Sequence, residues 1–176
     1  MSESRLNPQQ RLLVKSRANG CCEYCLSQEE YSPDTFTIEH IVPLIKGGSN
    51  HLDNVANACQ GCNNLKCVAT EAIDSLTGRI VPLYHPRQHN WHDHFTWNED
   101  YTLMIGLSPI GRATIDKLAL NRRNVVNKRR LWRTFDPCQP QPELSAKLVA
   151  SGNSSKPSVS AGCDGCTGHA NDAPTS

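Results

Sequence analysis

The sequence predicts a small α+β protein with a ββα core held by cysteines, an accessory region of hairpins and helices, and a tail. Two Cys-x-x-Cys pairs bracket a β-branched stretch at residues 35–42, which is typical of a strand. Residues 77–136 alternate between strand-like and helix-like patterns. Of the last 40 residues, 21 are Ser, Pro, Gly or Ala and none is aromatic, so this segment cannot bury a core.

The first half of the chain contains recognisable helix and strand signals. Asn7-Pro8 is typical of a helix N-cap followed by proline at the first helical position. Residues 35–42, TFTIEHIV, form the first expected strand, and residues 55–58 form the second, with a polar loop between them. The stretch after Cys62, NNLKCVATEAIDSL, is expected to form a helix.

The second half is expected to add a strand at residues 79–83 and a hairpin at residues 91–105. Ser108-Pro109 is typical of one helix start, and Asn121 of another that leads into RRNVVNKRRLWRTF. These signals divide the chain into four parts: an N-terminal helix (1–19), a core (20–76), an accessory α/β extension with a basic helix (77–136) and a disordered tail (137–176).

Charge is unevenly distributed along the chain. Residues 1–110 carry 8 Lys/Arg and 12 Asp/Glu, whereas residues 111–135 carry 8 Lys/Arg and one acid. Such a basic block favours a polyanionic partner, although many such runs are solvated helix faces. The opening MSESRLNPQQ lacks the apolar stretch of a secretory signal, and no run is long enough to span a bilayer. We therefore expect a cytoplasmic protein with no membrane partner.

The cysteines predict a structural metal site. In a reducing compartment, Cys-x-x-Cys pairs indicate metal or redox chemistry rather than disulfides. Two pairs can supply four thiolates to one tetrahedral zinc ion, each pair from a tight turn. A redox role is the alternative, but a redox motif does not need a second pair that flanks a strand hairpin. The predicted ligands of a structural Zn²⁺ are Cys22, Cys25, Cys59 and Cys62.

Polar residues inside and beside these pairs form a pattern that is specific as an ensemble. The pattern is Glu39-His40-x-x-Pro43, Gly47-Gly48, Asn54 and Cys59-x-x-Cys62-Asn63-x-x-Lys66. Over about residues 20–68 it resembles the HNH endonuclease family, in the subgroup whose ββα-metal core is bracketed by a four-cysteine zinc site. Residues 82–87, 91–97 and 106–122 are also similar to the C-terminal extension of some bacterial HNH proteins.

The resemblance implies catalytic roles for four residues. His40 matches the general base that takes a proton from the attacking water, and Asn54 matches the asparagine that holds the base-bearing loop. Glu39 and Asn63 match the pair that binds one catalytic divalent cation, and their oxygen donors point to Mg²⁺ or Mn²⁺. Adjacent strand residues face opposite ways, so Glu39 and His40 share one site only if the strand ends there, as Pro43 favours.

The expected function is metal-dependent hydrolysis of phosphodiester bonds in DNA, by nicking or double-strand cleavage, in a monomer or a homodimer. Residues expected to contact nucleic acid are Lys66 of the motif and the basic residues Arg122, Arg123, Lys128, Arg129, Arg130 and Arg133. Two alternatives stay open. One is a non-catalytic zinc-ribbon module that binds nucleic acid, and the other is an HNH nuclease that cleaves RNA.

Overall fold

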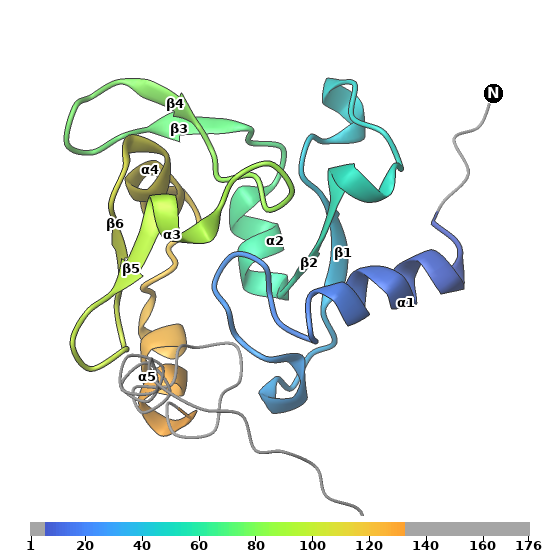
Figure 1. The fold of residues 1–176 in the computed structure, drawn as a ribbon, viewed down its shortest axis with the longest axis horizontal. Coiled ribbons are helices and arrows are strands. Elements are labelled where there is room, and N and C mark those ends of the chain that lie inside the picture. Colours follow the sequence, from blue (N-terminus) through green and yellow to red (C-terminus); the bar gives the residue numbers. More distant parts are fainter. Residues whose placement is uncertain (1–5, 133–176) are drawn as a thin grey trace, which may run out of the picture. The chain divides into compact units, whose positions relative to one another are not determined.

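The computed structural model describes residues 6–132 (Figure 1). The predicted tail and Arg133 lie outside this range. The helices are α1 (Pro8–Arg17), α2 (Gln60–Lys66), α3 (Trp91–His94), α4 (Pro109–Lys117) and α5 (Arg123–Trp132). The strands are β1 (Thr37–His40), β2 (Val55–Ala58), β3 (Glu71–Ile73), β4 (Ile80–Pro82), β5 (Phe95–Trp97) and β6 (Met104–Gly106). Within residues 6–132 we find no helix that combines the length and the apolar character needed to cross a membrane.

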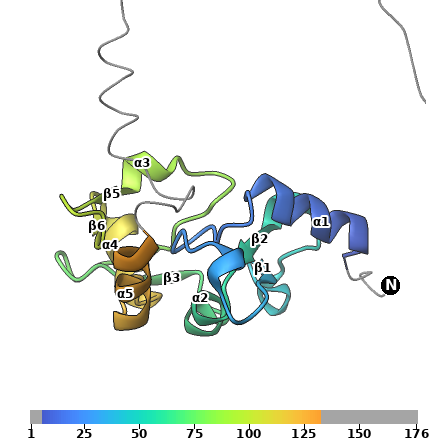
Figure 2. The same cartoon turned by 90° about the horizontal axis from the view of Figure 1, so that it is seen from below.

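Helix α1 begins at the predicted cap. The Asn7 side chain accepts a hydrogen bond from the backbone of Gln10 (2.8 Å), and the Gln10 side chain accepts one from the backbone of Asn7 (2.9 Å). This reciprocal arrangement satisfies two backbone donors that a helix start leaves open. The helix packs beside β2 (Figures 1 and 2), with Val14 fully buried. Arg17 in its last turn donates to the carbonyl of Leu52 at 2.8 Å, which fixes the helix to the loop before β2.

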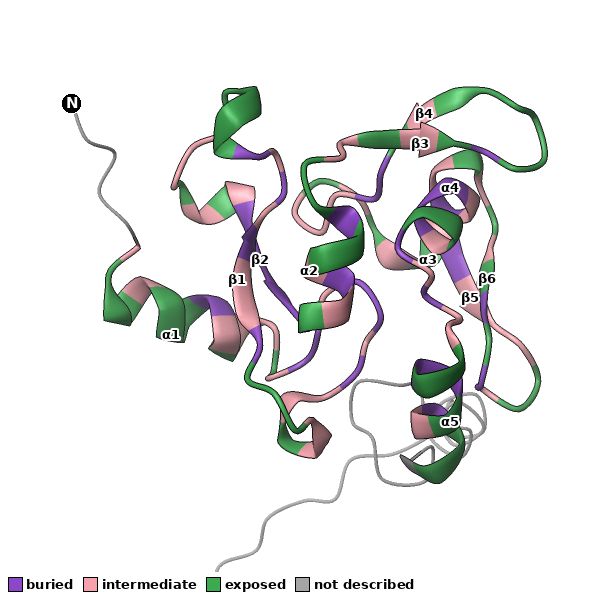
Figure 3. Ribbon diagram, turned by 180° about the vertical axis from the view of Figure 1, so that it is seen from behind, coloured by how far each residue is buried: buried purple, intermediate pink, exposed green. Residues whose placement is uncertain are grey.

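The first two strands and the helix that follows them form the predicted ββα unit. Strand β1 pairs antiparallel with β2, with Thr37 opposite Ala58 and His40 opposite Val55. All four residues of β2 are buried (Figure 3), and α2 begins two residues after the strand and packs against β1. The α+β class and the ββα core expected from the sequence are therefore confirmed.

The predicted helix after Cys62 is wrong in its extent. Helix α2 starts earlier, at Gln60, and ends at Lys66, where Cys67 adopts a positive φ of 49°. Residues 71–73 are not helical but form β3, which pairs antiparallel with β4. Local helix propensity is a weak prior, and here the long-range pairing of two strands overrides it.

The chain beyond α2 consists of two hairpins and two longer helices, and the first hairpin begins with β3, before the boundary expected at residue 77. The hairpin expected at residues 91–105 is present only from Phe95 onward, because residues 91–94 form the short helix α3. Helix α4 packs against both hairpins. Arg112 of α4 reaches the β3–β4 turn and donates two hydrogen bonds to the buried Asp74 carboxylate, at 2.7 and 2.9 Å. These bonds, together with one from Thr77, hold the pKa of Asp74 well below its usual range.

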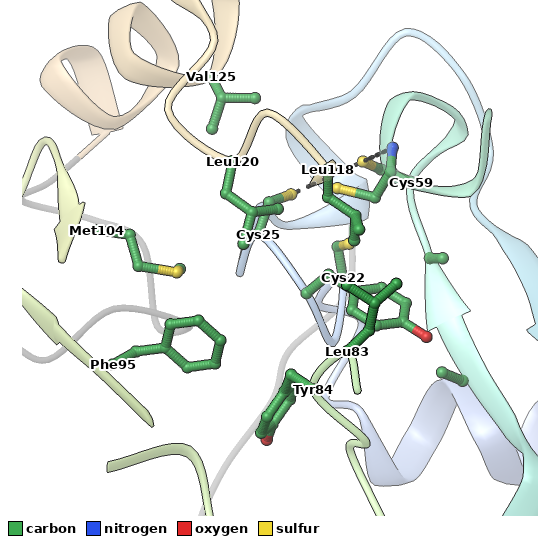
Figure 4. Packing of buried hydrophobic residues seen from close by; sticks show 14 of the residues in the cluster. Cys22, Cys25, Cys59, Leu83, Tyr84, Phe95, Met104, Leu118, Leu120 and Val125 are labelled. Carbon is green, nitrogen blue, oxygen red and sulfur yellow. Dashed lines mark hydrogen bonds between the residues drawn. The ribbon is translucent and has the colours of Figure 1, made fainter. Parts of the chain in front are cut away.

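One buried apolar cluster extends from the cysteine pairs into the extension (Figure 4). Leu118 and Leu120, which follow α4, pack near the cysteine side chains, and Val125 of α5 lies beside them. Phe95 and Met104 of the second hairpin belong to the same cluster. The extension therefore supplies part of the apolar wall around the four cysteines.

Candidate active site and metal centre

Four cysteine side chains converge where the loop after α1 meets the end of β2 and the start of α2. Their Sγ atoms all lie within 4.8 Å of one another. The sulfurs of Cys25 and Cys59 are 3.7 Å apart. A tetrahedral zinc ion with Zn–S bonds of about 2.3 Å would place its sulfur ligands about 3.8 Å apart. The cluster fits a structural metal such as zinc, and it contains all four predicted ligands: Cys22, Cys25, Cys59 and Cys62.

Backbone hydrogen bonds explain why the two cysteine pairs meet. Cys59 caps α2, and its Sγ accepts a hydrogen bond from the backbone of Cys62 at 3.4 Å. The first pair is attached to β2, because the backbone N–H of Glu23 donates to the carbonyl of Asn57 at 2.9 Å. The buried Asn57 side chain in turn donates to the carbonyl of Cys21 at 3.0 Å. Strand β2 thus sets the distance between the two pairs.

Asn54 fastens the loop between β1 and β2. Its side-chain oxygen accepts from the backbone of Val42 at 2.9 Å, and its amide donates to the carbonyls of Val42 (2.9 Å) and Ser49 (2.8 Å). Gly48 is required at this point, because a Cβ there would lie 1.8 Å from the Val42 oxygen and 2.8 Å from the Asn54 amide nitrogen. Asn54 therefore ties together the two ends of this loop.

His40 lies at the end of β1 and is partly exposed. Its Nε2 is 2.9 Å from the side-chain oxygen of Asn50 in the same loop. An amide oxygen accepts hydrogen bonds, so Nε2 is the donor of this bond, and in the neutral ring Nδ1 is then the nitrogen that can accept a proton. The sequence did not identify Asn50 as a site residue, because an asparagine in a polar loop has no distinctive spacing.

Glu39 points away from His40. The ladder stays regular through both residues, with Glu39 opposite Ala56 and His40 opposite Val55, so their side chains face opposite sides of the hairpin. The Glu39 side chain is 4% exposed and accepts hydrogen bonds from Tyr24 (2.8 Å) and Lys66 (2.6 Å). The expectation that the strand ends and turns both side chains into one site is therefore wrong.

Lys66 is enclosed rather than presented to solvent. Its side chain is 1% exposed, and besides Glu39 it donates to the carbonyl of His40 at 3.1 Å. Burial raises the pKa of Glu39 above its usual value, although the Lys66 ammonium beside it acts in the opposite direction. This position disagrees with the phosphate contact expected of Lys66, because its ammonium is buried away from solvent and is already paired with Glu39.

Asn63 lies one helical turn before Lys66, on the same face of α2. Its side chain is partly exposed and has no hydrogen-bond partner among residues 6–132. No hydrogen bond joins the side chains of Asn63 and Glu39 in this part of the chain. The structure thus brings Glu39, Lys66 and the His40 carbonyl together, and it leaves the Asn63 amide open.

Residues 22–67 match the family model for HNH endonuclease. This segment is an HNH endonuclease domain. The match begins at the first ligand cysteine and ends just after α2, so it covers the cysteine cluster and the ββα unit. No curated protein matches the chain.

The basic residues predicted to bind nucleic acid fall into two groups. One group is buried or bonded to protein atoms, and the other is exposed. Arg129 is 1% exposed and donates to the carbonyls of Thr102 and Cys25, both at 3.1 Å, while its guanidinium stacks 4.7 Å from the Trp97 ring centre. Its predicted nucleic-acid contact disagrees with this burial. Arg122 is directed at the cysteine cluster, and Lys128 donates to the carbonyl of Gln28 at 3.1 Å. The residues of this set that are exposed in α5 are Arg123 and Arg130.

The extension also contributes a histidine beside the Asn54 loop. A cavity of about 390 Å³ lies against this loop, and its lining includes Gly48, Asn54 and, from the extension, His85 and Gln88. Burial, followed by the neighbouring His89, lowers the pKa of His85 below its usual value. The sequence showed several histidines in this region, but no spacing rule connected any of them to the HNH loop.

Proposed function

We propose that the HNH domain hydrolyses phosphodiester bonds of DNA, with His40 as the general base. The observation that carries this proposal is the hydrogen bond between His40 Nε2 and Asn50 Oδ1, which leaves Nδ1 free to accept a proton from water. Asn54 keeps the loop that carries Asn50 in register with the strand that carries His40.

A catalytic role explains these polar contacts better than a purely structural zinc ribbon does. A binding module needs the cysteine cluster and a basic surface, but it gains nothing from a partly exposed histidine oriented by an amide. Asn54 makes three hydrogen bonds to a loop that contains the partner of the candidate base. Such support from neighbouring residues is what a positioned proton acceptor requires.

Glu39 and Asn63 offer the type of donor that a hard divalent cation prefers, and we retain them as the proposed ligands of Mg²⁺ or Mn²⁺. When bound beside the phosphate that faces His40, this ion would supply positive charge for the phosphoryl and departing oxygens. Because the Glu39 side chain now faces away from His40, its carboxylate reaches that side of the hairpin only if the end of β1 changes conformation. Asn63 is open to it, whereas Glu39 is paired with Lys66. Ligation by Glu39 therefore requires the Lys66 ammonium to move aside or to share the carboxylate.

The proposal is tested with the purified full chain and supercoiled plasmid in Mg²⁺, Mn²⁺ or excess EDTA. We expect nicked circles to appear with a divalent ion and to disappear with the chelator, because one active centre cuts one strand in each binding event. A single-stranded RNA and a duplex RNA of matched length are tested in parallel. If a folded, zinc-loaded sample leaves the plasmid intact in both metals, the proposed nuclease activity on DNA is wrong.

We further propose that the exposed face of α5 contacts DNA phosphates. Arg123 and Arg130 are seven residues apart, or about two helical turns, so they lie on one side of the helix, and the exposed Asn127 lies between them. Their guanidinium groups are available, unlike those of Arg122 and Arg129.

The double variant Arg123→Ala/Arg130→Ala is expected to bind DNA more weakly and with a shallower salt dependence. Loss of two phosphate contacts should reduce the slope of log K against log salt by about 1.8. The measurement is fluorescence anisotropy of a labelled duplex over a series of salt concentrations. Arg11→Ala/Arg79→Ala removes the same charge from exposed positions elsewhere and should keep the parental slope. Equal slopes for the two double variants would mean that α5 is only a solvated helix.

A further inference from the structure

Arg122 makes direct contact with the second cysteine pair. Its Nη2 lies 3.5 Å from the sulfur of Cys59, and its Nη1 lies 3.7 Å from the sulfur of Cys62. Both distances are within the range of N–H···S hydrogen bonds. Nη1 also donates to the carbonyls of Leu118 (3.4 Å) and Ala119 (3.3 Å), which hold the guanidinium in place from the extension side.

The sequence of the second pair leaves room for this guanidinium. In Cys59-Gln60-Gly61-Cys62, a Cβ on Gly61 would lie 2.6 Å from Arg122 Nη2 and 3.1 Å from its Cζ. Any larger residue at position 61 would push the guanidinium off the sulfurs. The two N–H···S contacts and the lack of a side chain at Gly61 are separate observations. Both indicate a site that fits the guanidinium of Arg122.

Charge gives this contact a physical reason. Four thiolates around a dication carry a net charge of −2, and Cys22, Cys25 and Cys62 are fully buried while Cys59 is nearly so. An arginine side chain stays protonated in proteins, so the guanidinium is a permanent cation next to an excess of buried negative charge. Its planar fork places donors on two separate nitrogens in a fixed geometry, whereas an ammonium directs all of its donors from a single atom.

We propose that Arg122 is a positioning residue of the zinc site, which hydrogen-bonds the thiolates of Cys59 and Cys62 and so fastens the extension to the HNH domain. The proposal rests on a structural zinc ion at the four cysteines. Hydrogen bonds to a metal-bound thiolate lower its electron density, so they reduce its reactivity and stabilise the ligand sphere. Residues that support metal ligands in this way typically contribute 10- to 100-fold to metal affinity.

The test compares Arg122→Ala with Arg123→Ala, which removes the same charge from the neighbouring exposed position. In competition with a chromogenic chelator, Arg122→Ala is expected to bind zinc about 10- to 100-fold more weakly than the parent, and Arg123→Ala to match the parent. Zinc release by a thiol-alkylating reagent should also become faster for Arg122→Ala. In the Co²⁺-substituted protein, the sulfur-to-cobalt charge-transfer band should move to longer wavelength, because the thiolates lose their hydrogen-bond donors.

Two further variants keep the test decisive if Arg122→Ala does not fold. Arg122→Lys keeps the charge but loses the fork, and Gly61→Ala displaces the guanidinium without removing it. Both should reproduce the shift of the cobalt band and the faster zinc release in a milder form. A lower melting temperature with parental zinc affinity and an unshifted band would mean that Arg122 only packs the extension. A folded parent that contains no zinc would also overturn the proposal.

Discussion

Replacement of His40 by alanine is expected to lower the plasmid-nicking rate by at least about 100-fold while the protein keeps its fold. The imidazole is the proposed proton acceptor, and general-base assistance contributes about 10²- to 10⁴-fold to such reactions. His40 contacts Asn50 and belongs to no metal cluster among residues 6–132. Zinc content and DNA affinity should therefore stay at parental values, and calorimetric binding of Mn²⁺ should change little.

The matched control for this variant is His92→Ala, which removes an exposed histidine from α3. It should nick DNA at the parental rate. Rates are compared at saturating Mg²⁺ from the decay of supercoiled plasmid, with zinc content measured on the same preparations. Parental nicking by a zinc-loaded His40→Ala protein would show that the imidazole is a strand-end residue and would leave the proposed mechanism without its base.

Removal of the metal from the four-cysteine cluster is expected to unfold the HNH domain. Structural zinc sites contribute on the order of 10–16 kcal/mol of apparent binding free energy, and whole domains are stable by only about 5–15 kcal/mol. The cluster also joins β2, α2 and the first cysteine loop, so these elements lose their common anchor without the ion. Elemental analysis should find one zinc per chain before chelation.

The measurement follows near-ultraviolet circular dichroism and the melting transition before chelation, after chelation under reducing conditions, and after zinc is restored. Cys62→Ser should imitate the chelated state. Cys67→Ser replaces an exposed thiol outside the cluster and should resemble the parent in zinc content and melting temperature. A zinc-free protein with a parental melting transition would contradict the structural role of the cluster.

Features with a local cause could be predicted from the sequence. The N-cap of α1 needs only Asn7 and its neighbours, and each cysteine pair turns within four residues. The strands at residues 37–40 and 55–58 are short β-branched or buried runs, and their spacing around a polar loop allows one simple pairing. The HNH pattern combines these local signals, so residues 22–67 can be recognised as an HNH segment from the sequence alone.

Features that depend on a distant partner could not be predicted in this way. A lysine in the last turn of α2 looks solvated in the sequence, and only the approach of β1 shows that Lys66 is paired with Glu39. Similarly, a run of basic residues gives no sign that Arg122 faces thiolates while Arg129 is buried against Trp97. The proposed roles of Glu39 and Asn63 as ligands of a catalytic cation stay predictions.

The segment that carries the HNH pattern is shorter than the part of the chain that packs around the four cysteines. Residues 22–67 carry the HNH pattern, yet the carbonyl of Cys25 is bound by Arg129, more than 60 residues beyond the end of that segment. Leu118 and Leu120 contribute to the apolar wall around the cysteines. An excised HNH segment would therefore expose this wall to water and lose hydrogen-bond partners of its buried groups. We therefore expect that residues 22–67 do not fold correctly on their own. A shortened or fused protein that is meant to keep the HNH domain folded must retain the chain through α5.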